Sequence, residues 1–420
     1  MKKVYRNSLW MMSEKLLSIV GLIFVTSFVA RYIGPENFGK LTFATSIFAI
    51  VQTLAMFGSD NIIFQKTSKR QQTGERIIYA TKQTRNVLYT LFASVVLAYL
   101  YFSVDQLTFI FSLASCVAVY FALHDVYSIY FNATLQSHLN TLCNVTAIIV
   151  SLAVRYAIAE WQLPVAYLSI PIVLVAFIPF MMRRVLFEKY KVMQSGLLQQ
   201  HAKQYRHYML GVGKKLVLYS LSIAIFTKTS QLFLGLSSQH DLGIYTVAMT
   251  LGASFYFVLN ALISSFLTQI YAEKSFERSQ NKVARLNSLV AGVALSALLF
   301  FTLFGHFIIN WLYGPAYAEV NHILLPAVVV TLFSGLSTVA EKYLMKFNAY
   351  DYLHKKTMLL VLFNVCVTYS FIHLYGLNGA IFAILITELM SLTVFNYFYR
   401  GGMIFNTHVR MFKPSTYLHS

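Results

Sequence analysis

The chain has 420 residues, of which 57% are hydrophobic and only 11% are charged. Soluble globular proteins carry about 25% charged residues, so the composition excludes an ordinary soluble enzyme, a disordered chain and a secreted disulfide scaffold. The net charge of +18 would suggest nucleic acid as a partner in a soluble protein, but cationic residues also gather in the cytoplasmic loops of membrane proteins. The composition therefore predicts an all-α polytopic membrane protein with no nucleic-acid partner.

Twelve apolar stretches follow one another along the chain, each long enough to cross a membrane. A bilayer core of about 30 Å needs about 20 apolar residues in a helix. The stretches lie near 9–30, 41–64, 87–104, 107–131, 141–159, 163–182, 216–236, 243–270, 287–309, 322–345, 357–375 and 378–399. Because the number of crossings is even, both termini are expected on the same side of the membrane.

The charges of the connecting segments indicate which side that is. The N-terminus, every second loop and the C-terminal tail together hold 27 Lys and Arg residues, whereas the opposite loops hold only Arg31 and Lys40. Positive loops stay in the cytoplasm, so both termini are predicted to be cytoplasmic. The longest inner segment, 183–215, is basic and is predicted to be a linker with an amphipathic surface helix. It separates a six-helix lobe at 1–182 from a second one at 216–420.

The two halves carry a weak internal repeat. Phe38-Gly39 enters the second stretch and Leu242-Gly243 enters the eighth, each with an alanine five residues after the glycine. The two sites are six crossings apart, which predicts parallel repeats. Parallel repeats are typical of transporters with two lobes around a central cavity.

Lys228 is the deepest charge in the hydrocarbon region. It lies about 18 Å into its stretch at 1.5 Å per residue, too deep to reach water easily. A charge at the bilayer centre costs about 2.5–3.5 kcal/mol, so it usually faces a partner or a wet cavity. Lys228 is therefore a candidate for lining a cavity, and the alternative is a structural ion pair with a facing acid.

Other intramembrane charges lie closer to helix ends. There a long side chain can extend its charged group to the membrane surface, which is the alternative to a role in a cavity. The further candidate cavity cations are Lys15, Arg155, Arg31 and Lys342. Glu388 is close to the middle of the last stretch. It is a candidate counter-ion of a lysine or a candidate carrier of a proton or sodium ion. Glu341 and Glu14 are further candidates for either role. Asp60 lies toward an inner helix end and is interpreted as structural.

Catalytic motifs are missing from the sequence. The segment 211–215 (GVGKK) lacks the spacing of a phosphate-binding loop, and neither G-x-S-x-G nor H-E-x-x-H occurs. The three cysteines show no metal-binding spacing. The sequence therefore predicts a transporter rather than an enzyme, without cofactor or metal site, driven by an ion gradient or by the gradient of its substrate.

Residues 30–39 (ARYIGPENFG) resemble the A-R-Y-L-G-P-E-x-F-G signature of polysaccharide-repeat exporters, the Wzx-type O-antigen flippase branch of the MOP (multidrug/oligosaccharidyl-lipid/polysaccharide) superfamily. Shorter matches follow in the same order at 57–60, 242–245, 312–315 and 375–380. One departure concerns the family pattern K-x-D-Q, which reads Lys228-Thr229-Ser230-Gln231 here. Ser230 replaces the acid, which speaks against ion coupling at this patch and favours an anion as the partner of Lys228.

The resemblance implies a MATE-like flippase for undecaprenyl-diphosphate-linked oligosaccharide, an O-antigen or capsule repeat unit of lipopolysaccharide biosynthesis. It would move this lipid from the cytoplasmic to the periplasmic leaflet of the bacterial inner membrane. The lipid tail would stay in the bilayer while the cavity cations attract the diphosphate, and the lobes would expose the cavity alternately. A polysaccharide polymerase and a chain-length regulator are implied as further partners.

Three alternatives stay open. Another MOP exporter, such as a lipid II flippase or a cation-coupled drug pump, would share the fold, although a drug pump should have a more acidic cavity. A membrane-embedded polymerase or glycosyltransferase should show a large outer loop or an acidic catalytic motif, and the sequence has neither. A non-catalytic scaffold of polysaccharide assembly is the third alternative.

Overall fold

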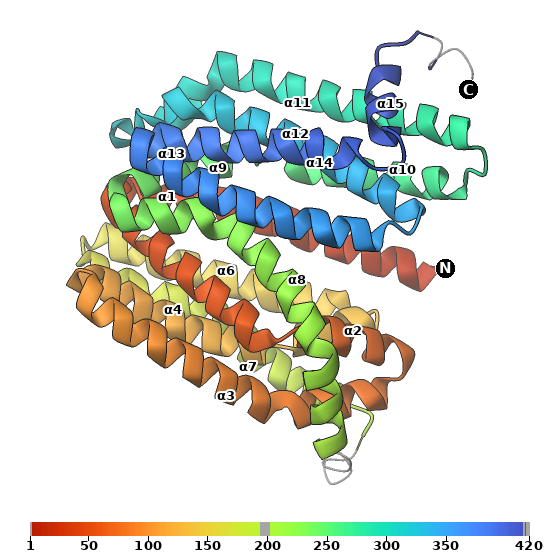
Figure 1. Cartoon of the computed structure of the whole chain (residues 1–420). Coiled ribbons are helices and arrows are strands. Elements are labelled where there is room, and N and C mark those ends of the chain that lie inside the picture. Colours follow the sequence, from red (N-terminus) through yellow and green to blue (C-terminus); the bar gives the residue numbers. More distant parts are fainter. Residues whose placement is uncertain (1, 194–201, 415, 417–420) are drawn as a thin grey trace. The chain divides into compact units, whose positions relative to one another are not determined.

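The computed structural model shows an all-helical chain (Figure 1). It describes residues 2–193, 202–414 and 416, with side chains at 23, 27–193, 202–214, 216–218, 220–414 and 416. The longer helices are α1 (Lys2–Met56), α3 (Gln71–Ser103), α4 (Gln106–His124), α6 (Ser137–Glu160), α7 (Ser169–Tyr190), α8 (Ala202–Ser237), α9 (Gln239–Gly252), α10 (Tyr256–Ala272), α11 (Phe276–Leu312), α12 (Val320–Lys346) and α13 (Tyr350–Leu392). The short helices are α2 (Ser59–Lys69), α5 (Tyr127–Ala133), α14 (Val394–Tyr397) and α15 (Met403–Arg410), with 3₁₀ turns at Val165–Leu168 and Pro315–Tyr317.

Two helices are too long for a single crossing, and each is broken at a glycine. The 55 residues of α1 would span about 82 Å at 1.5 Å per residue, far more than the bilayer core. Gly34 in α1 has φ 76° and Gly376 in α13 has φ 55°, values that favour glycine. Within the described residues, ten helices are long and apolar enough to cross a membrane. The break at Gly34 falls between the predicted stretches 9–30 and 41–64, and the break at Gly376 falls between 357–375 and 378–399.

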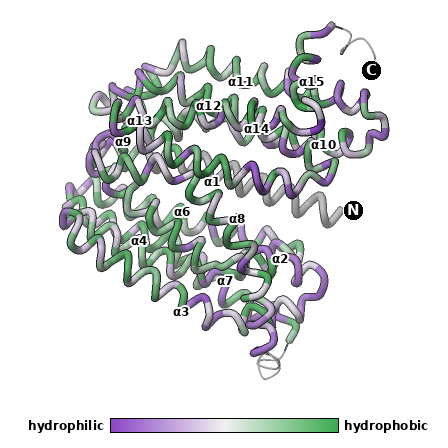
Figure 2. Tube along the Cα trace, viewed as in Figure 1, coloured by the Kyte–Doolittle hydropathy of each residue, from purple (hydrophilic) through white to green (hydrophobic). Residues whose placement is uncertain are grey.

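Hydrophobic residues make up long stretches of the helices, which are green along the tube in Figure 2. On α11, exposed apolar residues recur every four positions, which places them on one helix face. They are Leu295, Leu299, Leu303, Phe307 and Trp311. In water such a stripe would be an aggregation hazard, whereas in a bilayer it is the face that lipid chains solvate.

The basic segment 183–215 consists largely of the end of α7 and the beginning of α8. Helix α7 continues to Tyr190 and α8 begins at Ala202, so both run past the ends of the predicted membrane stretches. The predicted separate surface helix is therefore wrong for 183–190 and 202–215, because the flanking helices continue there. Residues 194–201 lie outside the described part of the chain.

The chain divides into two compact units. Unit 1 comprises Met1–Ile33 and Lys40–Lys228, and unit 2 comprises Gly34–Gly39 and Thr229–Ser420. All three borders fall inside helices: two lie within α1, before Gly34 and after Gly39, and one lies within α8 after Lys228. The predicted lobes, 1–182 and 216–420, were defined by the membrane crossings and not by compact packing. This division stays a prediction.

Unit 1 has its core where α2, α3, α5 and α7 meet. Ile63, Ile77, Tyr130 and Phe187 are all at most 1% exposed there. The buried carboxylate of Glu75 accepts hydrogen bonds from the Tyr130 hydroxyl (2.8 Å) and from the backbone amides of residues 192 (2.9 Å) and 193 (3.0 Å). These bonds fix the chain just after α7 and satisfy a carboxylate that would be costly to bury without partners.

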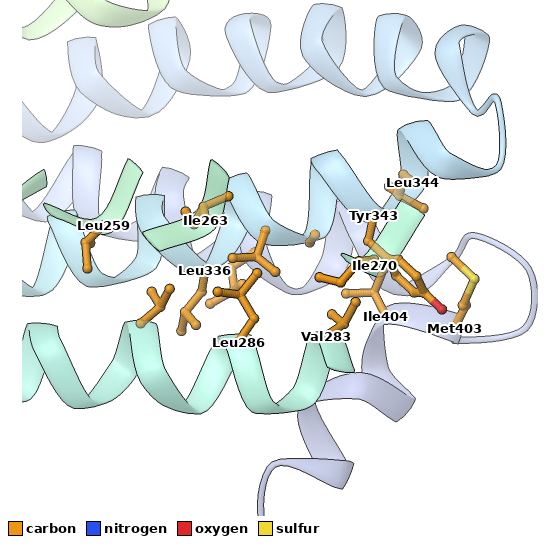
Figure 3. Close-up of a cluster of buried hydrophobic side chains, with 14 of the residues drawn as sticks. Leu259, Ile263, Ile270, Val283, Leu286, Leu336, Tyr343, Leu344, Met403 and Ile404 are labelled. Atoms are coloured by element: carbon orange, nitrogen blue, oxygen red, sulfur yellow. The ribbon is translucent and has the colours of Figure 1, made fainter. Parts of the chain in front are cut away.

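Unit 2 has a longer apolar core (Figure 3). Ile263 of α10, Leu286 of α11 and Tyr343 of α12 interlock there, and Ile404 of α15 closes one end. The short helix α15 is thus an integral part of unit 2. Its buried Ile404 is 0% exposed, although the sequence contained no apolar stretch of membrane length in this region.

A close helix crossing in unit 2 explains the two repeat glycines. A Cβ on Gly39 would lie 1.7 Å from the backbone oxygen of Gln239, and a Cβ on Gly243 would lie 2.0 Å from that of Pro35. Gln239 lies four residues before Gly243, and Pro35 lies four residues before Gly39. The two contacts are therefore equivalent with the partners exchanged. Only glycine permits such an approach of backbone to backbone, so the weak sequence repeat corresponds to a reciprocal contact.

Candidate functional site

A cavity of about 500 Å³ lies in unit 1 between the second segment of α1, the start of α2, and α8. Its lining residues are Ala49, Gln52, Thr53, Met56, Gly58, Asp60, Ser220, Ile223, Ala224, Thr227 and Lys228. On α1 and α8 these positions follow the spacing i, i+3, i+4 and i+7, so each of these two helices turns one face toward the cavity. Its volume is in the range of small-molecule sites, about 300–1,000 Å³.

The turn between α1 and α2 sets the packing beside this cavity. Phe57 and Gly58 both have positive φ, 49° and 69°, and they redirect the chain between the two helices. A Cβ on Gly58 would lie 2.5 Å from the Leu216 Cβ, and a Cβ on Gly213 would lie 2.5 Å from the Phe57 ring. The two glycines thus let α8 press directly on the turn. This contact borders the cavity on the side where α8 begins.

The lining combines polar groups with apolar ones. Lys228 is half-buried and contributes an ammonium group. The hydroxyls of Thr53 and Thr227 donate to backbone carbonyls one turn earlier, at 3.0 Å in each case, and so leave oxygen lone pairs for a ligand. Gln52 adds an amide, while Met56 and neighbouring alanines add apolar surface. Such a lining suits a ligand with a charged polar head and an apolar part.

Asp60 lines the same cavity, although it was interpreted from the sequence as structural. It reaches the lining because the turn at Phe57 and Gly58 redirects the chain between α1 and α2. Spacing within one helix therefore gave no signal for its role. Its carboxylate offsets the charge of Lys228, so the lining is not purely cationic, in contrast to the cationic cavity expected.

The other predicted cations are not part of this lining. Arg31 is exposed on the first segment of α1, and Arg155 is half-buried on α6. Lys342 belongs to α12 of unit 2, where its backbone oxygen accepts a hydrogen bond from Tyr271 (2.9 Å). The side chains of Lys15 and Glu14 lie outside the described residues.

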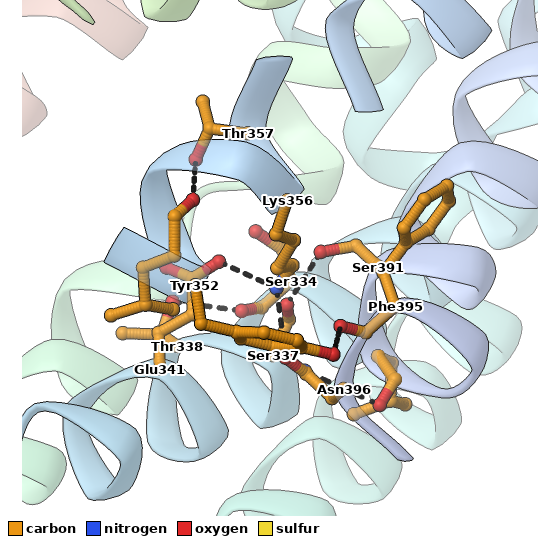
Figure 4. Close-up of polar contacts among 12 residues, drawn as sticks. Ser334, Ser337, Thr338, Glu341, Tyr352, Lys356, Thr357, Ser391, Phe395 and Asn396 are labelled. Atoms are coloured by element: carbon orange, nitrogen blue, oxygen red, sulfur yellow. Dashed lines mark hydrogen bonds and ion pairs between the residues drawn. The ribbon is translucent and has the colours of Figure 1, made fainter. Parts of the chain in front are cut away.

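Glu341, one of the two predicted acids of unit 2, lies beside a buried lysine that sequence reasoning left unassigned (Figure 4). The ammonium of Lys356, which is 3% exposed, donates to Glu341 Oε1 (2.9 Å) and Asn396 Oδ1 (3.1 Å). Glu388 is 8% exposed and accepts a hydrogen bond from Ser334. These charges therefore belong to a polar cluster inside unit 2, separate from the lining of the cavity in unit 1.

Comparison with known sequences identifies one family. A family model described as "Polysaccharide biosynthesis protein" matches residues 28–322, well over half of the chain. No curated protein sequence matches the chain significantly.

Several solved structures are similar to the chain over most of its length. The chain is similar to the lipid II flippase MurJ in an inward closed conformation, with a TM-score of 0.71, 12% identity, and coverage of 95% of this chain and 90% of that one. It is also similar to an inward-facing multidrug resistance MATE family transporter of the MOP superfamily, with a TM-score of 0.65, 15% identity, and coverage of 97% and 98%. A MATE structure in complex with MaD3S gives a TM-score of 0.61 at 14% identity, covering 98% and 96%. At these identities the likeness shows a shared fold, the all-α polytopic fold of the MOP superfamily.

Proposed function

Because the chain belongs to the polysaccharide biosynthesis protein family, we propose that it is a flippase for undecaprenyl-diphosphate-linked oligosaccharide. It moves an O-antigen or capsule repeat unit from the cytoplasmic to the periplasmic leaflet of the bacterial inner membrane. A polysaccharide polymerase and a chain-length regulator are the proposed downstream partners. The cycle is alternating access, as in other transporters built from repeats.

The observation that carries this proposal is Lys228 on the wall of a roomy, mostly uncharged cavity at membrane depth. An ammonium group in such a place attracts a phosphorylated head by charge. The threonine, serine and glutamine groups of the lining offer hydrogen bonds to sugar hydroxyls. The isoprenoid tail needs no protein site, because the bilayer solvates it.

Asp60 gives the cavity a way to release the same head group. A site that conducts must bind strongly enough to admit its ligand and weakly enough to let it leave. A carboxylate beside the cationic wall lowers the affinity for an anion without removing the attraction of Lys228. Arg155, Arg31, Lys15 and Lys342 stay proposed contributors to the positive field in other states of the cycle. Glu14, Glu341 and Glu388 stay proposed counter-ions or coupling groups.

The second candidate is a multidrug exporter, favoured by the likeness to MATE structures. Pumps for cationic drugs need an acidic site, whereas the deepest charge of this cavity is basic. The neighbour named as a lipid II flippase handles a lipid-linked substrate and gives the higher TM-score of 0.71. Both points favour the lipid-linked oligosaccharide.

Export of the lipid-linked repeat unit in a strain that lacks its own flippase tests the proposal. We expect the wild-type chain to restore surface polysaccharide, Lys228→Ala to lose most of this activity, and Lys228→Arg to keep it because the charge is retained. Lys214→Ala is the matched control, since Lys214 is an exposed lysine of the same helix outside the cavity. Full activity of Lys228→Ala would contradict the role of the cavity.

A further inference from the structure

Unit 1 contains a second, smaller cavity that the proposed function does not use. It has a volume of about 230 Å³ and lies between α2, the first turns of α3, and the first turns of α8. Its lining residues are Lys66, Thr73, Ile77, Gln204, Tyr205 and Tyr208. The positive loops place this end of unit 1 on the cytoplasmic side of the membrane.

Lys66 is held in this cavity by an aromatic ring. Its ammonium lies 4.6 Å from the centre of the Tyr208 ring, a cation–π distance. Within the described residues Lys66 makes no ion pair with a carboxylate. A ring positions an ammonium group without neutralising it or using up its three N–H donors. The cavity thus presents a positioned cation whose donors can reach an anion.

The remaining walls fit a small anion with oxygen atoms. Thr73 offers a hydroxyl and Gln204 an amide, and Tyr205 packs its ring against the apolar core of unit 1. Thr73 also lies in the first turn of α3, whose N-terminal end carries a positive partial charge. The volume suits a phosphate or diphosphate group rather than a whole oligosaccharide.

The surrounding charge favours an anion as well. Residues 61–85 and 202–214 contain nine Lys and Arg and only one acid, Glu75. That acid is 0% exposed and already accepts three hydrogen bonds from residues 130, 192 and 193. A cavity lined by one cation within a positive field concentrates anions from solution.

The two cavities lie at different heights along α8. Tyr208 and Ser220 are twelve residues apart, which is about 18 Å along a helix. Between them, Gly213 and Leu216 press against the turn at Phe57 and Gly58. The smaller cavity therefore lies on the cytoplasmic side of this contact, and the larger one lies beyond it.

We propose that the cavity around Lys66 and Tyr208 is a cytoplasmic docking site for the phosphate groups of a lipid head, which it binds before the head passes to the larger cavity. This inference rests on the proposed function for its place in the cycle, but binding at the site does not depend on transport. Lys66 supplies the charge, Tyr208 positions it, and Thr73 and Gln204 complete the set of hydrogen-bond donors.

Binding of inorganic pyrophosphate to the purified full-length protein in phosphatidylcholine nanodiscs tests the site, with calorimetry as the readout. We expect Lys66→Gln to weaken binding about tenfold, the loss typical of one charge-assisted hydrogen bond. Lys66→Arg should bind within about twofold of the wild type, since it keeps the charge. Lys69→Gln is the matched control, because Lys69 is an exposed lysine of the same helix that does not line the cavity. Equal affinity of Lys66→Gln and wild type, or an equal loss in Lys69→Gln, would overturn the proposal.

Tyr208 gives an independent variant in case Lys66→Gln fails to fold. Tyr208→Phe keeps the ring and should bind like the wild type, whereas Tyr208→Leu removes the ring and should bind severalfold more weakly. If both variants bind alike, the ring does not position the cation and the proposal fails.

The source of the phosphate is resolved by adding phosphatidylglycerol to the nanodiscs. Competition with pyrophosphate that disappears in Lys66→Gln supports a site open to anionic phospholipid heads, and no competition supports a site selective for diphosphate. The proposed function is judged separately by export. If Lys66-dependent binding persists while the wild type restores no export, the function fails and the site stands. If wild-type export depends on Lys228 while pyrophosphate binding ignores Lys66, the function stands and the site fails.

Discussion

Lys356 shows how a single buried charge shapes unit 2. The lysine is 3% exposed and donates to Glu341, whose side chain is 39% exposed. Removing Glu341 leaves the buried Lys356 ammonium without its ion-pair partner, and Glu388 remains as a nearby acid. Removing Lys356 leaves the Glu341 carboxylate, which still reaches water. We therefore expect the two single variants to differ in stability, although both delete the same pair.

Thermal unfolding in detergent measures this difference. Glu341→Gln should lower the Tm more than Lys356→Met does, with a cost below the about 3–5 kcal/mol of a fully buried pair because Glu341 is part-exposed. The double variant should regain part of the loss of Glu341→Gln, since it no longer buries the Lys356 ammonium without its ion-pair partner. Equal losses in the two single variants would show that the burial of Lys356 does not govern the stability of the pair.

His408 of α15 makes part of the stability of unit 2 depend on pH. Burial lowers the pKa of His408 to about 4, and its Nδ1 lies 2.9 Å from the Tyr397 hydroxyl. An unfolded histidine has a pKa of about 6.5. Between these two values the unfolded chain takes up a proton that the folded chain does not. This contribution to stability is therefore complete above pH about 6.5 and is lost as the pH falls toward 4.

We expect the fall in Tm between pH 7.5 and pH 5 to be smaller in His408→Asn than in the wild type. The exposed His354 of α13 supplies the matched control, and His354→Asn should keep the wild-type fall. A fall of the same size in His408→Asn would assign the pH response to other groups.

The role of a charged residue could be predicted from the sequence where its depth in an apolar stretch was sufficient evidence. Lys228 stood out because it lies far from either end of an apolar stretch, and the structure places it on a cavity wall. Asp60 and Lys66 were passed over because their roles depend on which helices come together across a gap in sequence. Composition and spacing within one helix contain no information about such partners.

At the scale of helices, the crossing of α1 and α9 depends on two glycines. An added methyl group at Gly39 or Gly243 would overlap a backbone oxygen, at 1.7 Å or 2.0 Å, and a backbone atom cannot rotate away. Overpacking typically costs about 1–3 kcal/mol, and we expect Gly39→Ala and Gly243→Ala to reach or exceed the upper end of that range.

The yield and Tm of folded protein check this expectation. Gly292→Ala is the control, because Gly292 lies within α11 and a Cβ there would have nothing within 4 Å. It should leave the Tm unchanged or slightly higher, as alanine favours helices. A tolerated alanine at Gly39 would mean that the helices separate there without harm.

The helices themselves were largely predictable, because apolar stretches of membrane length are unambiguous in sequence. The breaks in α1 and α13 were predicted as loops between stretches, and the structure reduces them to single glycines with positive φ. The length of α8 was not predictable. Its first turns are basic and polar, so hydropathy placed the start of the membrane stretch near 216. Tyr205 and Met209 pack against the core of unit 1, and the helix begins at Ala202.

For the whole molecule, the asymmetry of loop charge predicts the orientation of the chain in the membrane. Alkaline phosphatase fused after Gln162, between α6 and α7, should be active because this connection is predicted to be periplasmic. The same enzyme fused after Lys191, at the end of α7, should be inactive because that end is predicted to be cytoplasmic. Activity in the opposite pattern would invert the topology and remove the cytoplasmic assignment of the Lys66 cavity.

The reciprocal contact of Gly39 and Gly243 bears on the ancestry of the chain. Each half supplies one glycine and one carbonyl, and the two sets are interchangeable. An interface with that property is isologous, the kind through which identical subunits associate in pairs. A shorter ancestral polypeptide with a single copy of this motif would thus have had the means to dimerise with itself, and fusion of two such genes would have preserved the contact.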